Sequence, residues 1–167
     1  MSEKQYHIIT LLVENKPGVL QHIAGLFTRR CFNIDSLTVG ESEQEGLSRM
    51  TIISYGDEKI LEQIKKQLNK LVPVIKVRHL PKKESVLREL CLIKVKTANE
   101  EERDEIMQFT KIFRGSIVDV TKEAVIIEVT GDSEKINALI ELAKPFGILK
   151  TVRTGVSAIP RGVQAPH

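Results

Sequence analysis

The sequence repeats one pattern of capping and apolar residues, and this repeat limits the possible folds more than any other feature. Gly56-Asp57-Glu58-Lys59-Ile60 recurs as Gly131-Asp132-Ser133-Glu134-Lys135-Ile136, and each copy precedes apolar residues at helical spacing. The segment 74–78 likewise recurs at 148–153, in each case as an apolar run that ends in arginine. A repeat of about 80 residues indicates two copies of one structural unit.

Each half predicts the order strand-helix-strand-strand-helix-strand. In the first half we expect strands at residues 6–13, 33–39, 47–55 and 72–80, and helices at 17–30 and around 60–71. In the second half we expect strands at 90–97, 116–120, 124–130 and 148–153, and helices that begin after Asn99 and after Asp132. This order predicts the α+β class, with two ferredoxin-like βαββαβ domains.

The polar segment Pro81-Lys82-Lys83-Glu84-Ser85 breaks the periodicity and predicts the domain boundary. We therefore expect an N-terminal domain at residues 1–81 and a C-terminal domain at residues 82–167. From Ala158 onward the sequence contains Pro160, Gly162 and Pro166, which favour a flexible tail.

Each predicted sheet is antiparallel, with helices on one face, so the other face stays uncovered. Four apolar side chains of the first sheet, namely Leu37, Val39, Ile52 and Ile53, favour a partner contact by stacking or by edge pairing. We therefore expect a homodimer.

The composition is typical of a soluble chain: 41% of the 167 residues are hydrophobic, 28% are charged, and the formal net charge is +3. The polar residues 1–5 lack a secretory signal pattern, and no apolar run is long enough to span a bilayer. Cys31 and Cys91 form no paired metal or redox spacing, which favours reduced thiols. We expect a cytoplasmic protein that does not associate with membranes.

The sequence offers no catalytic or metal site. The four histidines are scattered, and none has a second ligand at metal-binding helix spacing. The densest carboxylate group, residues 100–105, opens a predicted helix, where acidic residues are stabilised by the helix dipole and solvent. A nucleophile turn and a glycine-rich phosphate loop are both missing. We expect a chain without catalytic activity and without a cofactor of its own.

RNA-recognition domains share the βαββαβ order, so nucleic-acid binding is an alternative function for a chain with this pattern. Such domains stack bases on aromatic side chains of the central strands. Here the third strand has Arg49, Thr51, Ile53 and Tyr55 on one face, and only 4% of the chain is aromatic. This composition argues against nucleic-acid binding.

The segment Glu14–Leu20 is the best candidate for a binding site. Pro17 and Gly18 open a helix where a small ligand could approach free backbone N–H groups, and the helix dipole there favours an anion. The corresponding second-half segment Thr97-Ala98-Asn99-Glu100-Glu101-Glu102 has three acidic residues that would repel an anion. A zwitterionic amino acid fits the first loop, although Pro17-Gly18 could also be a simple turn.

In this model of binding, the ligand carboxylate meets the helix N–H groups near Asn15 and Gly18. Its ammonium group meets an oxygen such as the Asn33 carbonyl, and its side chain contacts apolar residues. The candidate site residues are Asn15, Gly18, Val19, Leu20, Asn33 and Ile34.

The longer run Asn15-Lys16-Pro17-Gly18-Val19-Leu20, followed by Phe32-Asn33-Ile34-Asp35-Ser36-Leu37-Thr38-Val39, resembles the ACT domain of acetolactate synthase small subunits. In the second half, Ile112-Phe113-Arg114-Gly115-Ser116-Ile117-Val118-Asp119-Val120-Thr121 is similar to the same family. The resemblance covers nearly the whole chain. Lys16-Pro17 differs from the acidic-then-small pair of some members.

The resemblance implies a non-catalytic regulatory subunit of acetolactate synthase, also called acetohydroxyacid synthase, in branched-chain amino-acid biosynthesis. In this family the large subunit holds thiamine diphosphate, a divalent metal (Mg) and FAD. The small subunit raises large-subunit activity and confers feedback inhibition, usually by valine bound between paired ACT domains. An enzyme-independent ACT-type amino-acid sensor that regulates another enzyme is the alternative.

Overall fold

The computed structural model describes residues 5–162 and divides into two compact units. The N-terminal unit extends to Val86 and includes the chain again from Val156 onward, and the C-terminal unit is Leu87–Gly155. The chain therefore leaves the N-terminal unit once and returns to it, unlike the predicted division at residue 81.

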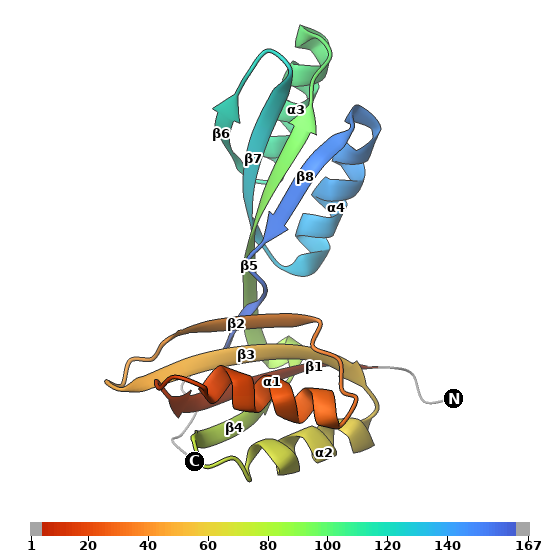
Figure 1. Cartoon of the computed structure of the whole chain (residues 1–167). Helices are drawn as coiled ribbons and strands as arrows, with labels where there is room; N and C mark the ends of the chain where they lie inside the picture. The colour runs from red at the N-terminus through yellow and green to blue at the C-terminus, as the bar shows by residue number, and fades with distance from the viewer. Residues whose placement is uncertain (1–4, 163–167) are drawn as a thin grey trace. The chain divides into compact units, whose positions relative to one another are not determined.

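The N-terminal unit is a four-stranded antiparallel sheet in the order β2-β3-β1-β4. Its helices α1 and α2 lie on one face of this sheet (Figure 1). The elements are β1 (Gln5–Glu14), α1 (Val19–Arg29), β2 (Ser36–Glu41), β3 (Leu47–Gly56), α2 (Glu58–Leu68) and β4 (Val74–Leu80). The central pair β1 and β3 stays in register from Gln5↔Gly56 to Glu14↔Leu47.

The core of this unit lies between the sheet and its helices. Alternate residues of β1, including Ile9 and Leu11, pack there with Ile23, Phe27 and Ile64 of the helices. Leu37 and Ile52 also face this core. Val39 pairs with the core residue Met50 and so shares this face, which leaves only Ile53 of the four expected residues on the uncovered face, because neighbouring residues of a strand point to opposite faces of a sheet.

The C-terminal unit repeats the plan, with the strand order β6-β7-β5-β8 and α3 and α4 on one face (Figure 1). Its elements are β5 (Ser85–Lys96), α3 (Glu100–Ile112), β6 (Ser116–Val120), β7 (Ala124–Gly131), α4 (Ser133–Ala143) and β8 (Ile148–Arg153), with short 3-10 turns η1 (Lys82–Glu84) and η2 (Lys144–Phe146). Cys91, Ile93 and Ile106 belong to its core. The predicted fold class of two ferredoxin-like units is confirmed.

The repeated Gly-Asp pair has a local physical role. Asp57 Oδ1 accepts a hydrogen bond from the Ile60 amide at 2.8 Å, and Asp132 Oδ1 accepts one from the Lys135 amide at 2.8 Å. A Cβ at Gly56 would lie 2.8 Å from the Ile60 side chain. The aspartates therefore cap α2 and α4, and the preceding glycine lets the helix start close to the strand.

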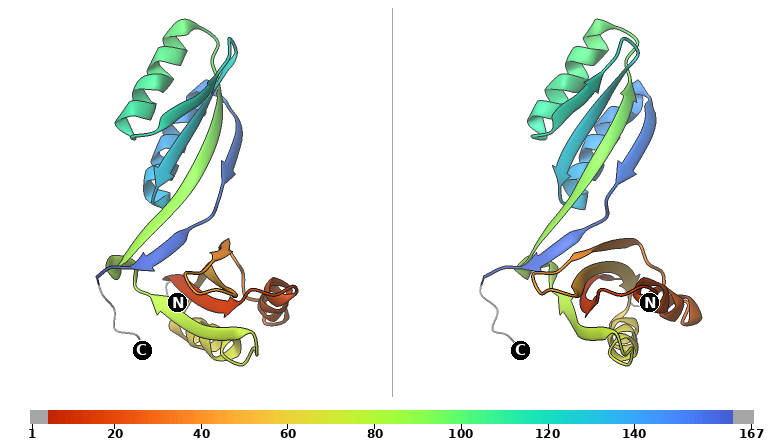
Figure 2. Two further views of the ribbon diagram at one scale, coloured as in Figure 1. Left: turned by 90° about the vertical axis from the view of Figure 1, so that its left-hand side faces the viewer. Right: turned by 60° about the vertical axis from the view of Figure 1, so that its left-hand side comes forward.

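Residues 157–160 form a strand where a flexible tail was expected from Ala158 onward, and Pro166 of that expected tail lies outside the described residues. Strand β9 (Ser157–Pro160) pairs with β5 (Figure 2), and the Arg161 amide donates to the Glu84 carbonyl at 2.7 Å. Just before β9, the Val156 amide donates to Ser36 Oγ and the Val156 carbonyl accepts from Thr38 Oγ1, each at 2.9 Å. These hydrogen bonds join residues distant in sequence, so local composition did not reveal them.

No helix within residues 5–162 is long and apolar enough to cross a lipid bilayer.

Candidate functional site

The loop between β1 and α1 is a tight turn. The Val19 amide lies 3.4 Å from the Lys16 carbonyl oxygen, and Gly18 has φ 85° and ψ −14°. Pro17 followed by a residue with positive φ is the arrangement of a type II turn. Helix α1 therefore begins at Val19, and the prediction that it begins at Pro17 was wrong. The left-handed backbone of Gly18 is not helical, so it separates Pro17 from the first helical residue.

Helix α1 begins without a side-chain cap. Its N-cap residue is Gly18, no side chain accepts from the first turn, and that turn contains no acidic residue. Within residues 5–162 the other three α-helices are capped by side chains, α2 and α4 by their aspartates and α3 by Asn99. The first N–H groups of an α-helix have no partner inside the helix, so the start of α1 suits an anion.

The side chains around this turn separate into a packed group and an exposed group. Val19 is 6% exposed and packs in the core, whereas Leu20 is 44% exposed. Asn15 is exposed, and its amide donates to the Gly46 carbonyl at 2.8 Å, which ties the loop to the hairpin between β2 and β3. Space around Gly18 is open, since a Cβ there would meet nothing within 4 Å.

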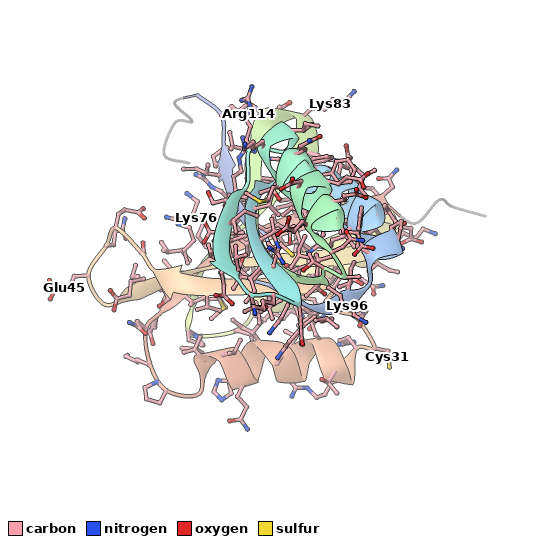
Figure 3. All side chains as sticks on the ribbon, turned by 90° about the horizontal axis from the view of Figure 1, so that it is seen from above. Cys31, Glu45, Lys76, Lys83, Lys96 and Arg114 are labelled. Atoms are coloured by element: carbon pink, nitrogen blue, oxygen red, sulfur yellow. The ribbon has the colours of Figure 1, made fainter. Side chains whose placement is uncertain are left out.

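The other two predicted residues, Asn33 and Ile34, lie beyond the opposite end of α1. The helix has 11 residues, so about 16 Å separates its two ends. Asn33 lines a cavity of about 370 Å³ together with Cys31, Phe32, Ser54, Tyr55, Gly56, Asp57 and Ile60. Figure 3 shows Cys31 next to the end of α1. One chain therefore does not bring the two groups of predicted residues together.

Hydrogen bonds fix Asn33 in place. Ser54 Oγ donates to the Asn33 carbonyl at 2.8 Å, and Asn33 Nδ2 donates to Asp35 Oδ1 at 2.9 Å. A carbonyl oxygen has two lone pairs, so this oxygen keeps capacity for a second donor. Sequence reasoning missed Ser54, because the hydrogen bond spans 21 positions and no local pattern marks it.

Charges differ between the two equivalent loops. Beside the α1 turn, Lys16 Nζ pairs with Glu14 Oε2 at 3.1 Å. In the C-terminal unit, the first turn of α3 contains three glutamates, the Glu102 amide donates to Asn99 Oδ1 at 2.8 Å, and Glu102 Oε2 accepts from the Ala98 amide at 2.7 Å. This reciprocal capping box already occupies the α3 terminus, so only the α1 turn can receive a carboxylate without displacing a cap.

In the described part of the chain, no group of three or more His, Cys, Asp or Glu side chains is placed to hold a metal ion.

Comparison with known proteins agrees with this architecture. A family model described as the AHAS small subunit-like ACT domain matches residues 9–76, and one for the small subunit of acetolactate synthase matches residues 88–162. A probable acetolactate synthase small subunit of Methanothermobacter thermautotrophicus is 61% identical over 96% of this chain and 95% of that protein. The acetolactate synthase small subunit of Bacillus subtilis is 49% identical over 94% of this chain and 91% of that protein.

A solved structure supports the same assignment. The crystal structure of the acetolactate synthase small subunit from Thermotoga maritima matches with a TM-score of 0.88 and 46% identity, and the match covers 96% of this chain and 99% of that chain. The family match over residues 9–76, on a unit with the βαββαβ fold, identifies the N-terminal unit as an ACT domain. The chain as a whole belongs to the family of acetolactate synthase small subunits.

Proposed function

We propose that this chain is the regulatory subunit of acetolactate synthase, which activates the catalytic large subunit and confers feedback inhibition by valine. The observation that supports this function most directly is the uncapped start of α1 at Gly18, in a chain of the small-subunit family. The catalytic chemistry, with thiamine diphosphate, Mg and FAD, belongs in this proposal to the large subunit.

The proposed valine site uses backbone groups at one end of α1 and fixed oxygens at the other. The valine carboxylate accepts hydrogen bonds from the first-turn amides beyond Gly18, where the helix dipole is favourable. Its ammonium group donates to the Asn33 carbonyl, and its isopropyl group contacts Leu20 and Ile34. Val19 contributes through its position in the core and not through side-chain contact, because its side chain is buried.

A homodimer brings these two groups together. Strand β2 is at one edge of the sheet, and β1 and β2 both run antiparallel to β3. Helix α1 connects β1 to β2 and therefore runs opposite to β2. In a two-fold pairing through β2, the two copies of α1 lie antiparallel, so the Gly18 turn of one chain lies beside Asn33 of its partner. We infer that this dimer contains two equivalent valine sites.

Regulation follows if valine binds one arrangement of the dimer more tightly than another. A ligand shifts an equilibrium only by its difference in affinity between the two states. If valine weakens the affinity of this chain for the large subunit by some factor, then by linkage the large subunit weakens the affinity for valine by that same factor. Titration calorimetry with the free chain and with the active complex measures both affinities, and equal affinities would remove the energetic basis of this scheme.

Reconstitution tests the function as a whole. The purified chain is added to its large subunit, and acetolactate formation is measured with and without valine, leucine and isoleucine. We expect higher activity without an amino acid and a decrease when valine is added. Valine binding without any effect on the large subunit would instead favour an independent amino-acid sensor, and a pulldown with the large subunit separates the two functions.

A further inference from the structure

A buried serine lies under the loop that follows α1. Ser54 of β3 is 1% exposed, and it lines the cavity of about 370 Å³ together with the exposed residue Asn33. It is two positions from Ile52, which packs in the core, so its side chain is on the face of the sheet that the helices cover. A buried hydroxyl group is costly unless it has a hydrogen-bond partner. Here the partner is the Asn33 carbonyl, whose oxygen is 2.8 Å from Ser54 Oγ.

This hydrogen bond fixes the direction of one carbonyl oxygen. The backbone is held on both sides of Asn33. On one side the Phe32 amide donates to the Phe27 carbonyl at 3.0 Å, and on the other the Asp35 amide donates to the Ile53 carbonyl at 2.9 Å. Neither of these bonds involves the peptide group that contains the Asn33 carbonyl. The serine hydroxyl therefore determines which way that peptide group points, and without the hydroxyl the peptide group is free to rotate.

The cavity favours a hydrogen-bond donor that carries a positive charge. A carbonyl oxygen only accepts hydrogen bonds, and the Asn33 oxygen keeps one lone pair beyond the one that the serine uses. Among the described residues that line the cavity, Asp57 alone is charged, and Arg29 and Arg30 at the end of α1 do not line it. The carbonyl dipoles at the C-terminal end of α1 add to the negative potential. An ammonium group suits this environment, whereas a second acceptor does not.

We propose that Ser54 is the positioning residue through which the valine site distinguishes an α-amino acid from the 2-oxo acid with the same carbon skeleton. The inference rests on the proposed function, in which the valine ammonium group donates to the Asn33 carbonyl. A 2-oxo acid places an oxygen acceptor where the amino acid has N–H donors, so it meets the fixed Asn33 oxygen without a hydrogen between them. Because Ser54 holds the peptide group, that group cannot turn and offer the Ile34 N–H to the 2-oxo acid.

Three variants of the full chain test this role. Ser54→Ala removes the hydroxyl, and Ser54→Thr keeps it in a residue that suits a strand. Ser85→Ala is the matched control, because Ser85 is 4% exposed and its Oγ donates to the Pro81 carbonyl at 2.9 Å, outside the cavity. The probes are valine and 3-methyl-2-oxobutanoate, the 2-oxo acid that corresponds to valine. Calorimetry measures valine binding, ligand-observed NMR measures the weaker 2-oxo acid, and thermal melts confirm that each variant is folded.

We expect the wild-type chain to bind the 2-oxo acid at least about 100-fold more weakly than valine, because the Asn33 oxygen then loses its donor. Ser54→Ala should weaken valine binding by about 3- to 10-fold and should not weaken binding of the 2-oxo acid. Ser54→Thr should restore the wild-type valine affinity, and Ser85→Ala should leave that affinity unchanged. The ratio of the two affinities therefore falls only when the hydroxyl at residue 54 is absent.

Several results would overturn the role of Ser54. One is equal valine affinity in Ser54→Ala and in the wild-type chain, and another is a loss that Ser54→Thr does not restore or that Ser85→Ala also shows. Equal losses for valine and the 2-oxo acid would indicate a general structural effect, and wild-type chain that binds both ligands equally would show no discrimination to explain. If the 2-oxo acid binds too weakly to measure, the valine affinities of the variants decide.

Together with the reconstitution assay, these measurements separate this inference from the proposed function. Wild-type chain that binds valine without any change in large-subunit activity would refute the regulatory function, and the variants would still decide the role of Ser54. Wild-type chain that does not bind valine would refute both.

Discussion

Two substitutions of Gly18 that differ by one negative charge test the proposed valine site. Gly18 has φ 85°, which strains any L side chain, but a Cβ there would meet no atom within 4 Å. Asp and Asn tolerate this left-handed backbone better than most residues and have nearly the same size. Gly18→Asp and Gly18→Asn should therefore share the same loss of stability, about 1 kcal/mol. They differ in one negative charge at the place proposed for the valine carboxylate.

The expected effect of that charge can be estimated from Coulomb's law. Two carboxylates about 5 Å apart repel by about 1 kcal/mol at a water-like dielectric constant and by about 3 kcal/mol at an effective value of 20. Gly18→Asp should therefore weaken valine binding by about 5- to 150-fold relative to Gly18→Asn. Activation of the large subunit should stay near the wild-type level in both variants, because the side chain added at Gly18 points into open space and leaves the core of the unit unchanged.

The assay is a valine titration of acetolactate formation, with calorimetry of valine binding to the free chain. The difference in valine affinity between Gly18→Asp and Gly18→Asn should decrease when the salt concentration is raised, since salt screens exposed charges. If Gly18→Asp and Gly18→Asn give the same half-inhibitory valine concentration, the carboxylate does not bind at this helix start, and the reasoning is refuted.

Three further predictions concern stability, each measured by denaturant or thermal unfolding. Burial and the neighbouring His7 imidazole lower the pKa of His79 in the folded chain. The free energy of unfolding that depends on neutral His79 should therefore be complete above about pH 6.5, the ordinary pKa of histidine, and should decrease as the pH falls through the lowered pKa. Arg153→Met should cost about 3 kcal/mol because it leaves the buried Glu89 carboxylate without its guanidinium, and adding Glu89→Leu should restore most of the loss. Gly115→Ala should cost about 1 to 3 kcal/mol, since its Cβ would lie 2.8 Å from the Glu128 carbonyl oxygen.

Local signals predicted the repeated fold. Asp57, Asn99 and Asp132 mark helix starts because their side chains bond to amides three residues later, an interaction contained within the segment itself. Apolar spacing then predicted the order of the first eight strands and of the four α-helices. The element order is thus encoded by interactions over a few residues, which a single sequence displays.

Features that depend on distant partners were not predictable in the same way. Strand β9 contains only four residues and ends in proline, and what holds the returning chain is the bonding of Val156 to Ser36 and Thr38, more than a hundred positions away. The site shows the same limit. Sequence suggested the start of α1 and Asn33 as parts of a binding site but not that Ser54 donates to the Asn33 carbonyl, because that hydrogen bond joins residues 21 positions apart.

The two units use one fold, yet only the first can accept a small anion at its first helix. An anion at α3 would have to displace the reciprocal hydrogen bonds of Asn99 and Glu102, each worth about 1 kcal/mol, and approach three carboxylates. At α1 no side chain accepts from the first turn, which contains no acidic residue, so the Leu20 and Gln21 amides have no side-chain competitor. The difference between an effector site and a structural helix start therefore comes from the capping residues and not from the fold, and Gly18 is the residue at which that difference can be tested.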